Sequence, residues 1–289
     1  MDDREIRIGS PLGIAAAEWA SSRWIDVDGR LVRYREAGTG LPLVLVHGLG
    51  VSADYWVRNG PPIAAAGFRV LAPDLPGFGR TAGPEAGLDV RAQAEAVRRW
   101  AKTIDLEPAV YLGHSLSCQA ILELAVARPE MVLGLVMAAP TGEGVGTRRL
   151  LSQALGLFRD LHNESPKLAM LVAQAYMRAG PLRVIRTWRM GAAHDPIKLL
   201  PRVPAPGLVI VGEHDPVVTL PFATKLAEGL ADGQLVVVPS GNHGLIFDTT
   251  GVFNGAVIQF LRRIQGIAVQ TDSSAGDEGG ATAGLRDLA

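Results

Sequence analysis

The hydrophobic residues of this chain follow two alternating patterns, short continuous runs and longer stretches with helical spacing. The runs have the length of buried strands, while 90–104 and 119–127 repeat their apolar positions with the period of an amphipathic helix. Alternation of this kind predicts an α/β fold, in which a mostly parallel, twisted β-sheet is flanked by helices. The runs predicted as strands are 43–46, 68–72, 108–112, 131–138, 207–211 and 234–238.

The start of the chain has a different pattern. Residues 24–34 alternate between apolar and polar side chains around Asp28-Gly29, a pair that favours a tight turn. We therefore expect an antiparallel hairpin at an edge of the sheet. The preceding residues, 1–23, form an N-terminal extension in which 12–20 has the pattern of a short amphipathic helix.

Residues 142–203 interrupt the alternation of strands and helices. They lack a clear strand pattern and are rich in Leu, Met, Phe and Trp, with several prolines, so they predict an inserted group of helices. The α/β core then comprises 24–141 and 204–265. The last residues, 266–289, are rich in Ser and Gly and poor in hydrophobic side chains, and we expect them to be disordered.

The composition agrees with a soluble protein that has one large core. The chain has 289 residues, of which 48% are hydrophobic and 20% charged, with a net charge of −1. This balance gives no reason to expect nucleic acid as a partner, and no stretch is apolar enough for a membrane span. The charged N-terminus lacks the apolar segment of a signal peptide, so we expect a cytoplasmic protein. Cys118 is the single cysteine, which excludes an internal disulfide.

The predicted insertion is basic. Residues 142–203 contain ten Arg or Lys and four Asp or Glu, a net charge of +6. One interpretation is that this charge steers an acidic substrate towards the site. The other, which we favour, is that long cationic side chains form the solvated face of amphipathic helices.

In the stretch 111–117, Tyr-Leu-Gly-His-Ser-Leu-Ser, an apolar run is followed directly by a serine that has small neighbours. A helical pattern begins after this serine. A sharp strand-to-helix turn would push the Ser115 hydroxyl into a cleft, where free amide groups of the helix also point. Gly113 supplies one of the small neighbours, but Ser117 stands where the G-x-S-x-G pattern has its second glycine. The alternative is that Ser115 only caps the helix.

Two further polar residues follow predicted strands downstream. Asp215 comes after the fifth of the six runs, and His243 lies in a glycine-lined loop after the sixth. Proteins with open α/β sheets bind their ligands at the carboxyl ends of such strands. A serine nucleophile needs a base, and the base needs a carboxylate to orient it. We predict Ser115 as nucleophile, His243 as base and Asp215 as the carboxylate, with Glu143 as the alternative acid.

The order Ser, Asp, His, each just beyond a strand, resembles that of the α/β-hydrolases. The resemblance covers about residues 24–265 and implies that 142–203 forms a helical cap over the catalytic cleft. The loop His47-Gly48-Leu49-Gly50 is similar to the oxyanion loop of that family. By this resemblance, the backbone N–H groups of Leu49 and Leu116 form the oxyanion hole.

These predictions indicate a serine hydrolase that cleaves a carboxylic ester or a related acyl bond through an acyl-enzyme, with no cofactor and no metal. Thioesterases, lactonases and carbon–carbon bond hydrolases use the same triad, and the sequence does not separate them. A different class is a hydrolase fold that serves as a ligand-binding receptor or a non-hydrolytic biosynthetic catalyst. The apolar side chains of the insertion lead us to expect a small-molecule substrate with an apolar acyl or alkyl part.

Overall fold

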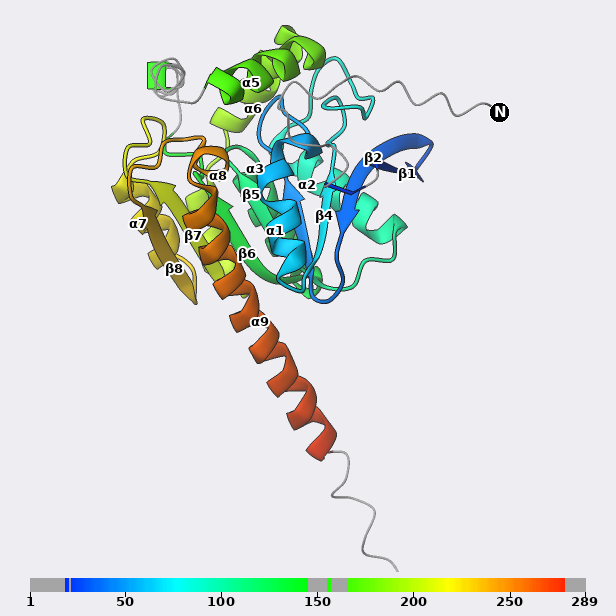
Figure 1. The fold of residues 1–289 in the computed structure, drawn as a ribbon, viewed down its shortest axis with the longest axis vertical. Coiled ribbons are helices and arrows are strands. Elements are labelled where there is room, and N and C mark those ends of the chain that lie inside the picture. The colour runs from blue at the N-terminus through cyan, green and yellow to red at the C-terminus, as the bar shows by residue number, and fades with distance from the viewer. Residues whose placement is uncertain (1–18, 21, 145–154, 157–165, 279–289) are drawn as a thin grey trace, which may run out of the picture.

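The chain folds around one β-sheet, as the computed structural model in Figure 1 shows. The structure describes residues 19–20, 22–144, 155–156 and 166–278. The strands are β1 Ser22–Val27, β2 Arg30–Ala37, β3 Pro42–Val46, β4 Arg69–Pro73, β5 Ala109–His114, β6 Val132–Ala138, β7 Gly207–Gly212 and β8 Gly233–Val238. Their order in the eight-stranded sheet is β1-β2-β4-β3-β5-β6-β7-β8. β2 pairs antiparallel with β1 and with β4, and the other neighbours are parallel.

Helices connect the strands and cover the sheet. α1 Gly60–Ala65 contacts α9 Thr250–Glu278 on one face, and α2 Val90–Thr103 packs against α3 Ser117–Ala127 on the other (Figure 1). None of the helices in the described part of the chain combines the length and the apolar character that a membrane crossing requires. The remaining helical elements are η2 Ala53–Arg58, η3 Pro129–Met131, α5 Pro166–Ala179, α6 Pro181–Ala192, η4 Pro196–Arg202, α7 Leu220–Glu228 and α8 Leu245–Asp248.

The predicted strands are confirmed. The six apolar runs correspond to β3 through β8, and the predicted hairpin corresponds to β1 and β2, with β1 at the edge. β3, β5 and β7 are buried along their whole length. Continuous apolar runs of this kind are expected where helices cover both faces of a parallel sheet.

The predicted insertion is helical where the structure describes it. It contains α5, α6 and η4, and α5 and α6 lie next to one end of the sheet (Figure 1). Arg183 of α6 joins this cap to the core by donating hydrogen bonds to the carbonyl oxygens of Gly77, at 2.8 Å, and Pro84, at 3.0 Å. Residues 145–154 and 157–165 of the insertion lie outside the described residues.

The C-terminal segment differs from the expectation. Helix α9 continues through residue 278, although disorder was predicted from 266. Its first turns bury Phe253, Val257 and Phe260 against the core. Once these packed first turns have formed, each further helical residue adds one backbone hydrogen bond. The segment that follows contains no proline, which would end the helix. The helix predicted at 12–20 falls on residues that are described only at 19 and 20, which are not helical.

Candidate active site

Ser115 lies at a sharp turn between β5 and α3. Its φ of 57° is in the left-handed region that residues other than glycine rarely adopt, so the backbone is strained. The turn is tight at Gly113, where an added Cβ would lie 2.8 Å from the amide nitrogen of Cys118. The N-cap of α3 is Leu116, which excludes the alternative that Ser115 only caps the helix.

Ser117 explains why the second glycine of the pattern is dispensable here. Its hydroxyl accepts a hydrogen bond from the N–H of His114, at 2.9 Å, and donates to the carbonyl oxygen of Val46, at 2.7 Å. The side chain is buried, so a small polar group fits and is satisfied. Ser117 therefore ties the turn to β3, the strand that leads into the loop at 47–50.

The structure brings the predicted nucleophile, base and acid together. His243 Nε2 lies 3.0 Å from Ser115 Oγ, and His243 Nδ1 lies 3.0 Å from Asp215 Oδ2. Asp215 Oδ1 also accepts hydrogen bonds from the N–H groups of Val217, at 2.8 Å, and Val218, at 3.0 Å. The Nδ1–H tautomer of His243 donates to the carboxylate and leaves Nε2 free to accept the serine proton.

The environment keeps Asp215 ionised. Burial alone would raise the pKa of its carboxyl group, but the facing His243 ring and the two backbone N–H groups outweigh burial and hold the pKa below its usual value. A carboxylate in this state can orient the imidazole and stabilise the imidazolium that forms when His243 takes a proton.

Glu143, the alternative acid, contacts a different side chain. Its Oε2 accepts a hydrogen bond from the Thr219 hydroxyl, at 2.9 Å. The carboxylate that hydrogen-bonds His243 Nδ1 is Asp215. The geometry therefore favours Asp215 as the acid of the site.

Two backbone amides lie beside Ser115. Leu49 and Leu116 line the same cavity as Ser115 and His243. An added Cβ at Gly48 would lie only 3.7 Å from Ser115 Cβ, so the loop backbone comes close to the hydroxyl. Within the described part of the chain, the N–H groups of Leu49 and Leu116 make no hydrogen bond. Both donors are available to an oxyanion.

His47 fixes the direction of the Leu49 N–H. Its Nε2 accepts a hydrogen bond from the N–H of Leu75, at 2.9 Å, so Nδ1 carries the proton and donates to the carbonyl oxygen of Gly48, at 2.8 Å. That carbonyl and the Leu49 N–H belong to one planar peptide unit. Burial lowers the pKa of His47, which keeps the ring neutral as this arrangement requires.

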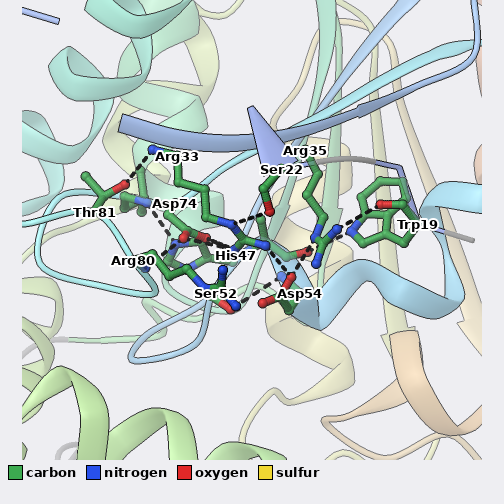
Figure 2. Close-up of polar contacts among 12 residues, drawn as sticks. Trp19, Ser22, Arg33, Arg35, His47, Ser52, Asp54, Asp74, Arg80 and Thr81 are labelled. Atoms are coloured by element: carbon green, nitrogen blue, oxygen red, sulfur yellow. Dashed lines mark hydrogen bonds and ion pairs between the residues drawn. The ribbon is translucent and has the colours of Figure 1, made fainter. Parts of the chain in front are cut away.

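A buried cluster of charges holds the end of this loop, and sequence reasoning did not find it (Figure 2). Asp74 accepts hydrogen bonds from the N–H of Ala53, at 2.7 Å, and from Arg33, at 3.1 Å. Arg33 also pairs with Asp54, at 2.6 Å, and its side chain is fully buried. Paired, hydrogen-bonded charges of this kind are costly to separate, so the cluster stabilises one geometry of the residues that follow β3.

A cavity of about 340 Å³ opens beside Ser115, between the sheet and the cap helices α5 and α6. The lining residues that the structure describes include no Asp, Glu, Lys or Arg. No group of three or more potential metal ligands occurs among the described residues either. The polar lining residues are Tyr55, His114, Ser115, Gln119, Thr141, Tyr176 and His243, and the remainder are apolar side chains, Trp188 and glycines.

Comparison with known proteins agrees with this fold. A family profile described as Alpha/beta hydrolase family matches residues 43–256, which is well over half of the chain. A 2-hydroxy-6-oxo-6-(2'-aminophenyl)hexa-2,4-dienoic acid hydrolase of Metapseudomonas resinovorans is 28% identical over 265 residues, covering 83% of this chain and 91% of that protein.

Solved structures give the same result for the fold. A bacterial membrane phospholipase A superposes with a TM-score of 0.74 at 24% identity, covering 86% of this chain and 87% of that one. A thermophilic esterase of Thermogutta terrifontis superposes with a TM-score of 0.73 at 20% identity, covering 85% of this chain and 99% of that one. These likenesses confirm the fold that the sequence predicted.

Proposed function

The chain belongs to the alpha/beta hydrolase family, and from this premise we propose that it is a serine hydrolase that cleaves a carboxylic ester or a closely related acyl bond. One observation carries the proposal: Ser115, His243 and Asp215 form a continuous hydrogen-bonded chain, with 3.0 Å at each step, in the wall of an apolar cavity. The proposal needs no cofactor or metal, because these side chains supply the nucleophile, the base and the orienting carboxylate.

The geometry supports a two-step mechanism. His243 Nε2 takes the proton of Ser115 as Oγ attacks the substrate carbonyl carbon, and Asp215 stabilises the imidazolium. The N–H groups of Leu49 and Leu116 donate to the developing oxyanion. His243 then gives its proton to the leaving alkoxide, which departs and leaves an acyl-serine. Water, with His243 again as base, hydrolyses the acyl-serine and regenerates Ser115.

The cavity supports a substrate that is largely apolar. Its described lining carries no charged carboxylate, ammonium or guanidinium group, and the cap contributes mainly Ala, Val, Tyr and Trp side chains. An uncharged acyl or alkyl group would be desolvated there without loss of a strong interaction with water. We therefore propose a small-molecule ester with an apolar part.

Carbon–carbon bond hydrolysis is the second candidate. It is favoured by the relative from Metapseudomonas resinovorans, whose name describes the hydrolysis of a dienoic acid. A carboxylic acid substrate is ionised at neutral pH and calls for a cationic partner. The lining residues that the structure describes contain no Arg or Lys, so the ester remains the preferred substrate.

The proposal is tested by labelling with a fluorophosphonate and by hydrolysis of 4-nitrophenyl esters. We expect the wild type to be labelled and Ser115→Ala to be unlabelled. Ser115→Ala and His243→Ala should each lose nearly all activity, and the double variant should be no worse than either, because the residues act as a unit. Wild-type turnover by His243→Ala, or equal labelling of Ser115→Ala, would contradict the proposal.

The assignment of the acid gives a second prediction. Asp215→Asn should lower kcat by about 10⁴-fold, because the amide holds His243 in the wrong tautomer. Glu143→Gln is the matched control and should change kcat little. The measurement is kcat for an ester that saturates the enzyme, with circular dichroism as a check on folding. The reverse pattern would move the acid to Glu143.

A further inference from the structure

The two cap helices have one face on the cavity and another in solvent. Val172 and Tyr176 of α5 and Trp188 of α6 line the cavity. On α5, Met170 and Met177 are instead 41% and 73% exposed. They are seven positions apart, about two turns, so they lie on one side of the helix. The proposed hydrolytic mechanism uses neither of them.

Helix α6 has a similar exposed side. Leu182 and Ile185 are 68% and 49% exposed, and Arg186 and Arg189 are exposed as well. Their spacing of three, four and seven positions from Leu182 places all four on one side of the helix. Large apolar side chains and cations therefore share this surface.

The exposed residues of the two helices adjoin. The helices contact each other, are joined at Gly180 and lie at the same end of the molecule (Figure 1). Met177 is close to the end of α5 and Leu182 is close to the start of α6, so the exposed surface continues across the turn. We call the following residues the outer cap face: Met170, Met177, Arg178, Leu182, Ile185 and Arg189.

The two helices carry charge of one sign. Residues 166–192 contain five Arg or Lys and no Asp or Glu, so they contribute +5 to a chain whose net charge is −1. Within the described chain, Arg178 and Arg189 form no ion pair or hydrogen bond. Arg186 donates to the carbonyl oxygen of Glu85, at 3.2 Å. A surface that serves solubility alone commonly mixes both signs.

The outer cap face fits a partner that offers an apolar medium next to negative charge. Exposed apolar side chains gain free energy when they leave water, and clusters of them mark interaction surfaces. Helices with apolar and cationic residues on their exposed side bind at the interface of anionic membranes. There the aliphatic side chains enter the boundary of the acyl chains, and each nearby cation is attracted by the lipid charge.

The position of the cavity favours lipid over two other partners. A symmetric contact with a second copy would place this face against itself and bring Arg178 and Arg189 close to their own equivalents, which is repulsive. An acidic protein would satisfy the cations. However, the same two helices line an apolar cavity on their inner side, and an apolar ester dissolves in a bilayer.

We propose that the outer cap face docks on the surface of an anionic lipid bilayer. Leu182 and Met177 enter the interface, and Arg178 and Arg189 meet the headgroups. This docking goes beyond the proposed function and does not depend on it. One consequence does rest on the proposed function: an ester dissolved in the bilayer is presented to the side of the molecule where the cap covers the cavity.

The test is co-sedimentation of the full chain with vesicles. Vesicles of phosphatidylcholine alone are compared with vesicles that contain equal parts of phosphatidylcholine and phosphatidylglycerol. We expect binding to the anionic vesicles that weakens as salt is added, and little binding to phosphatidylcholine alone. Arg178→Gln combined with Arg189→Gln should lower the partition coefficient about fivefold for each cation removed. Leu182→Gln should lower it about fivefold as well.

Matched controls carry the same substitutions elsewhere on the surface. Arg128→Gln combined with Arg262→Gln removes the same net charge, at the far end of α3 and on the part of α9 that extends away from the cap (Figure 1). Leu31→Gln matches Leu182→Gln, because Leu31 is 59% exposed and lies on the edge hairpin. These variants should keep wild-type binding.

Activity shows whether the variants remain folded. None of the substituted residues lines the cavity, so each variant should hydrolyse soluble 4-nitrophenyl acetate at the wild-type rate. With a long-chain ester dissolved in anionic vesicles, the rate should fall with the bound fraction in the outer cap face variants and stay unchanged in the controls. Circular dichroism confirms folding independently of activity.

The outcomes separate this inference from the proposed function. Equal binding to both kinds of vesicle, or equal effects of the outer cap face variants and their controls, overturns the inference and leaves ester hydrolysis intact. A dimer in sedimentation equilibrium that dissociates on Leu182→Gln would identify a contact between copies instead. Binding to polyglutamate as tight as to anionic vesicles, unchanged in Leu182→Gln, would identify an acidic protein partner. If no ester is hydrolysed, the proposed function fails, and vesicle binding still decides the inference.

Discussion

His114 contacts the candidate site without belonging to the hydrogen-bonded chain of Ser115, His243 and Asp215. It is 5% exposed, and its Nε2 lies 3.0 Å from the carbonyl oxygen of His243, to which it donates. Burial, with a further contribution from the neighbouring His243, lowers the pKa of His114 to about 3. The ring is therefore neutral throughout the pH range in which the enzyme would act.

This shift predicts a loss of stability in mild acid. An unfolded histidine titrates near 6.5, while folded His114 stays neutral down to a pKa of about 3. As the pH falls below 6.5, the unfolded chain takes up the proton first, which favours unfolding. Between pH 7 and pH 5, the free energy of unfolding should fall by about 2 kcal/mol more in the wild type than in His114→Gln. Urea unfolding at each pH measures both, and equal slopes would contradict the assignment.

Candidate site residues that directly follow an apolar run could be predicted from the sequence. Residues that are far apart in the sequence and in contact in the fold could not. Ser115, Asp215 and His243 each follow an apolar run, so the strand pattern places them at one edge of the sheet. His194 and Gln119 are 75 positions apart, and their contact leaves no local pattern. Arg33 and Asp74 are 41 positions apart, so the buried charge cluster is equally invisible in the sequence.

At the scale of elements, Arg183 connects the cap to the core. Its guanidinium donates to the carbonyl oxygens of Gly77, at 2.8 Å, and Pro84, at 3.0 Å, and also to Ala179 of α5, at 2.7 Å. With a longer hydrogen bond to the carbonyl oxygen of Gly83, at 3.5 Å, this one side chain contacts four carbonyl groups from α5 and a core loop. The cap position depends on charge-assisted hydrogen bonds as well as on apolar packing.

Arg183→Leu should therefore loosen the cap. We expect KM for esters with long acyl chains to rise about tenfold, since the pocket wall formed by α5 and α6 is no longer held, while kcat for acetate changes little. Arg186→Leu is the matched control, because Arg186 is exposed and donates to one carbonyl oxygen, that of Glu85, at 3.2 Å. Steady-state kinetics on both esters gives the comparison, and equal effects of the two variants would contradict this role.

The elements of the core were more predictable than those at its ends. β3 through β8 each have an apolar run and the hairpin of β1 and β2 has an alternating pattern, so the sheet is visible in the sequence. The length of α9 could not be predicted, because the helix continues past 266 from first turns that are packed against the core, whatever the local composition. The helical character of the insertion was predictable from its composition and from the absence of a strand pattern, but its contact with the core through Arg183 was not.

At the scale of the whole molecule, the positive charge of the cap lies away from the cavity where the structure describes it. Arg178, Arg186 and Arg189 are exposed, and Arg183 is held by carbonyl oxygens. The described lining of the cavity has no Arg or Lys side chain. This distribution favours the interpretation of the charge as a solvated helix face over the steering of an acidic substrate.

The cavity then predicts how activity depends on acyl chain length. Each methylene buried in it contributes about 0.8 kcal/mol at best, so kcat/KM for 4-nitrophenyl esters should rise up to about fourfold per carbon from acetate. The increase should end when the chain fills the cavity of about 340 Å³, and longer esters should be poorer substrates.

The same series tests whether the cap forms the wall that limits chain length. Val172 of α5 lines the cavity, so Val172→Phe should shift the optimum to shorter chains by removing volume. Gln174→Phe is the control, because Gln174 is exposed on the same helix and does not line the cavity. It should keep the wild-type optimum. A wild-type profile that is flat or falls from acetate upward would contradict an apolar pocket. It would favour a polar or anionic substrate, for which the +6 charge of 142–203 becomes the leading clue.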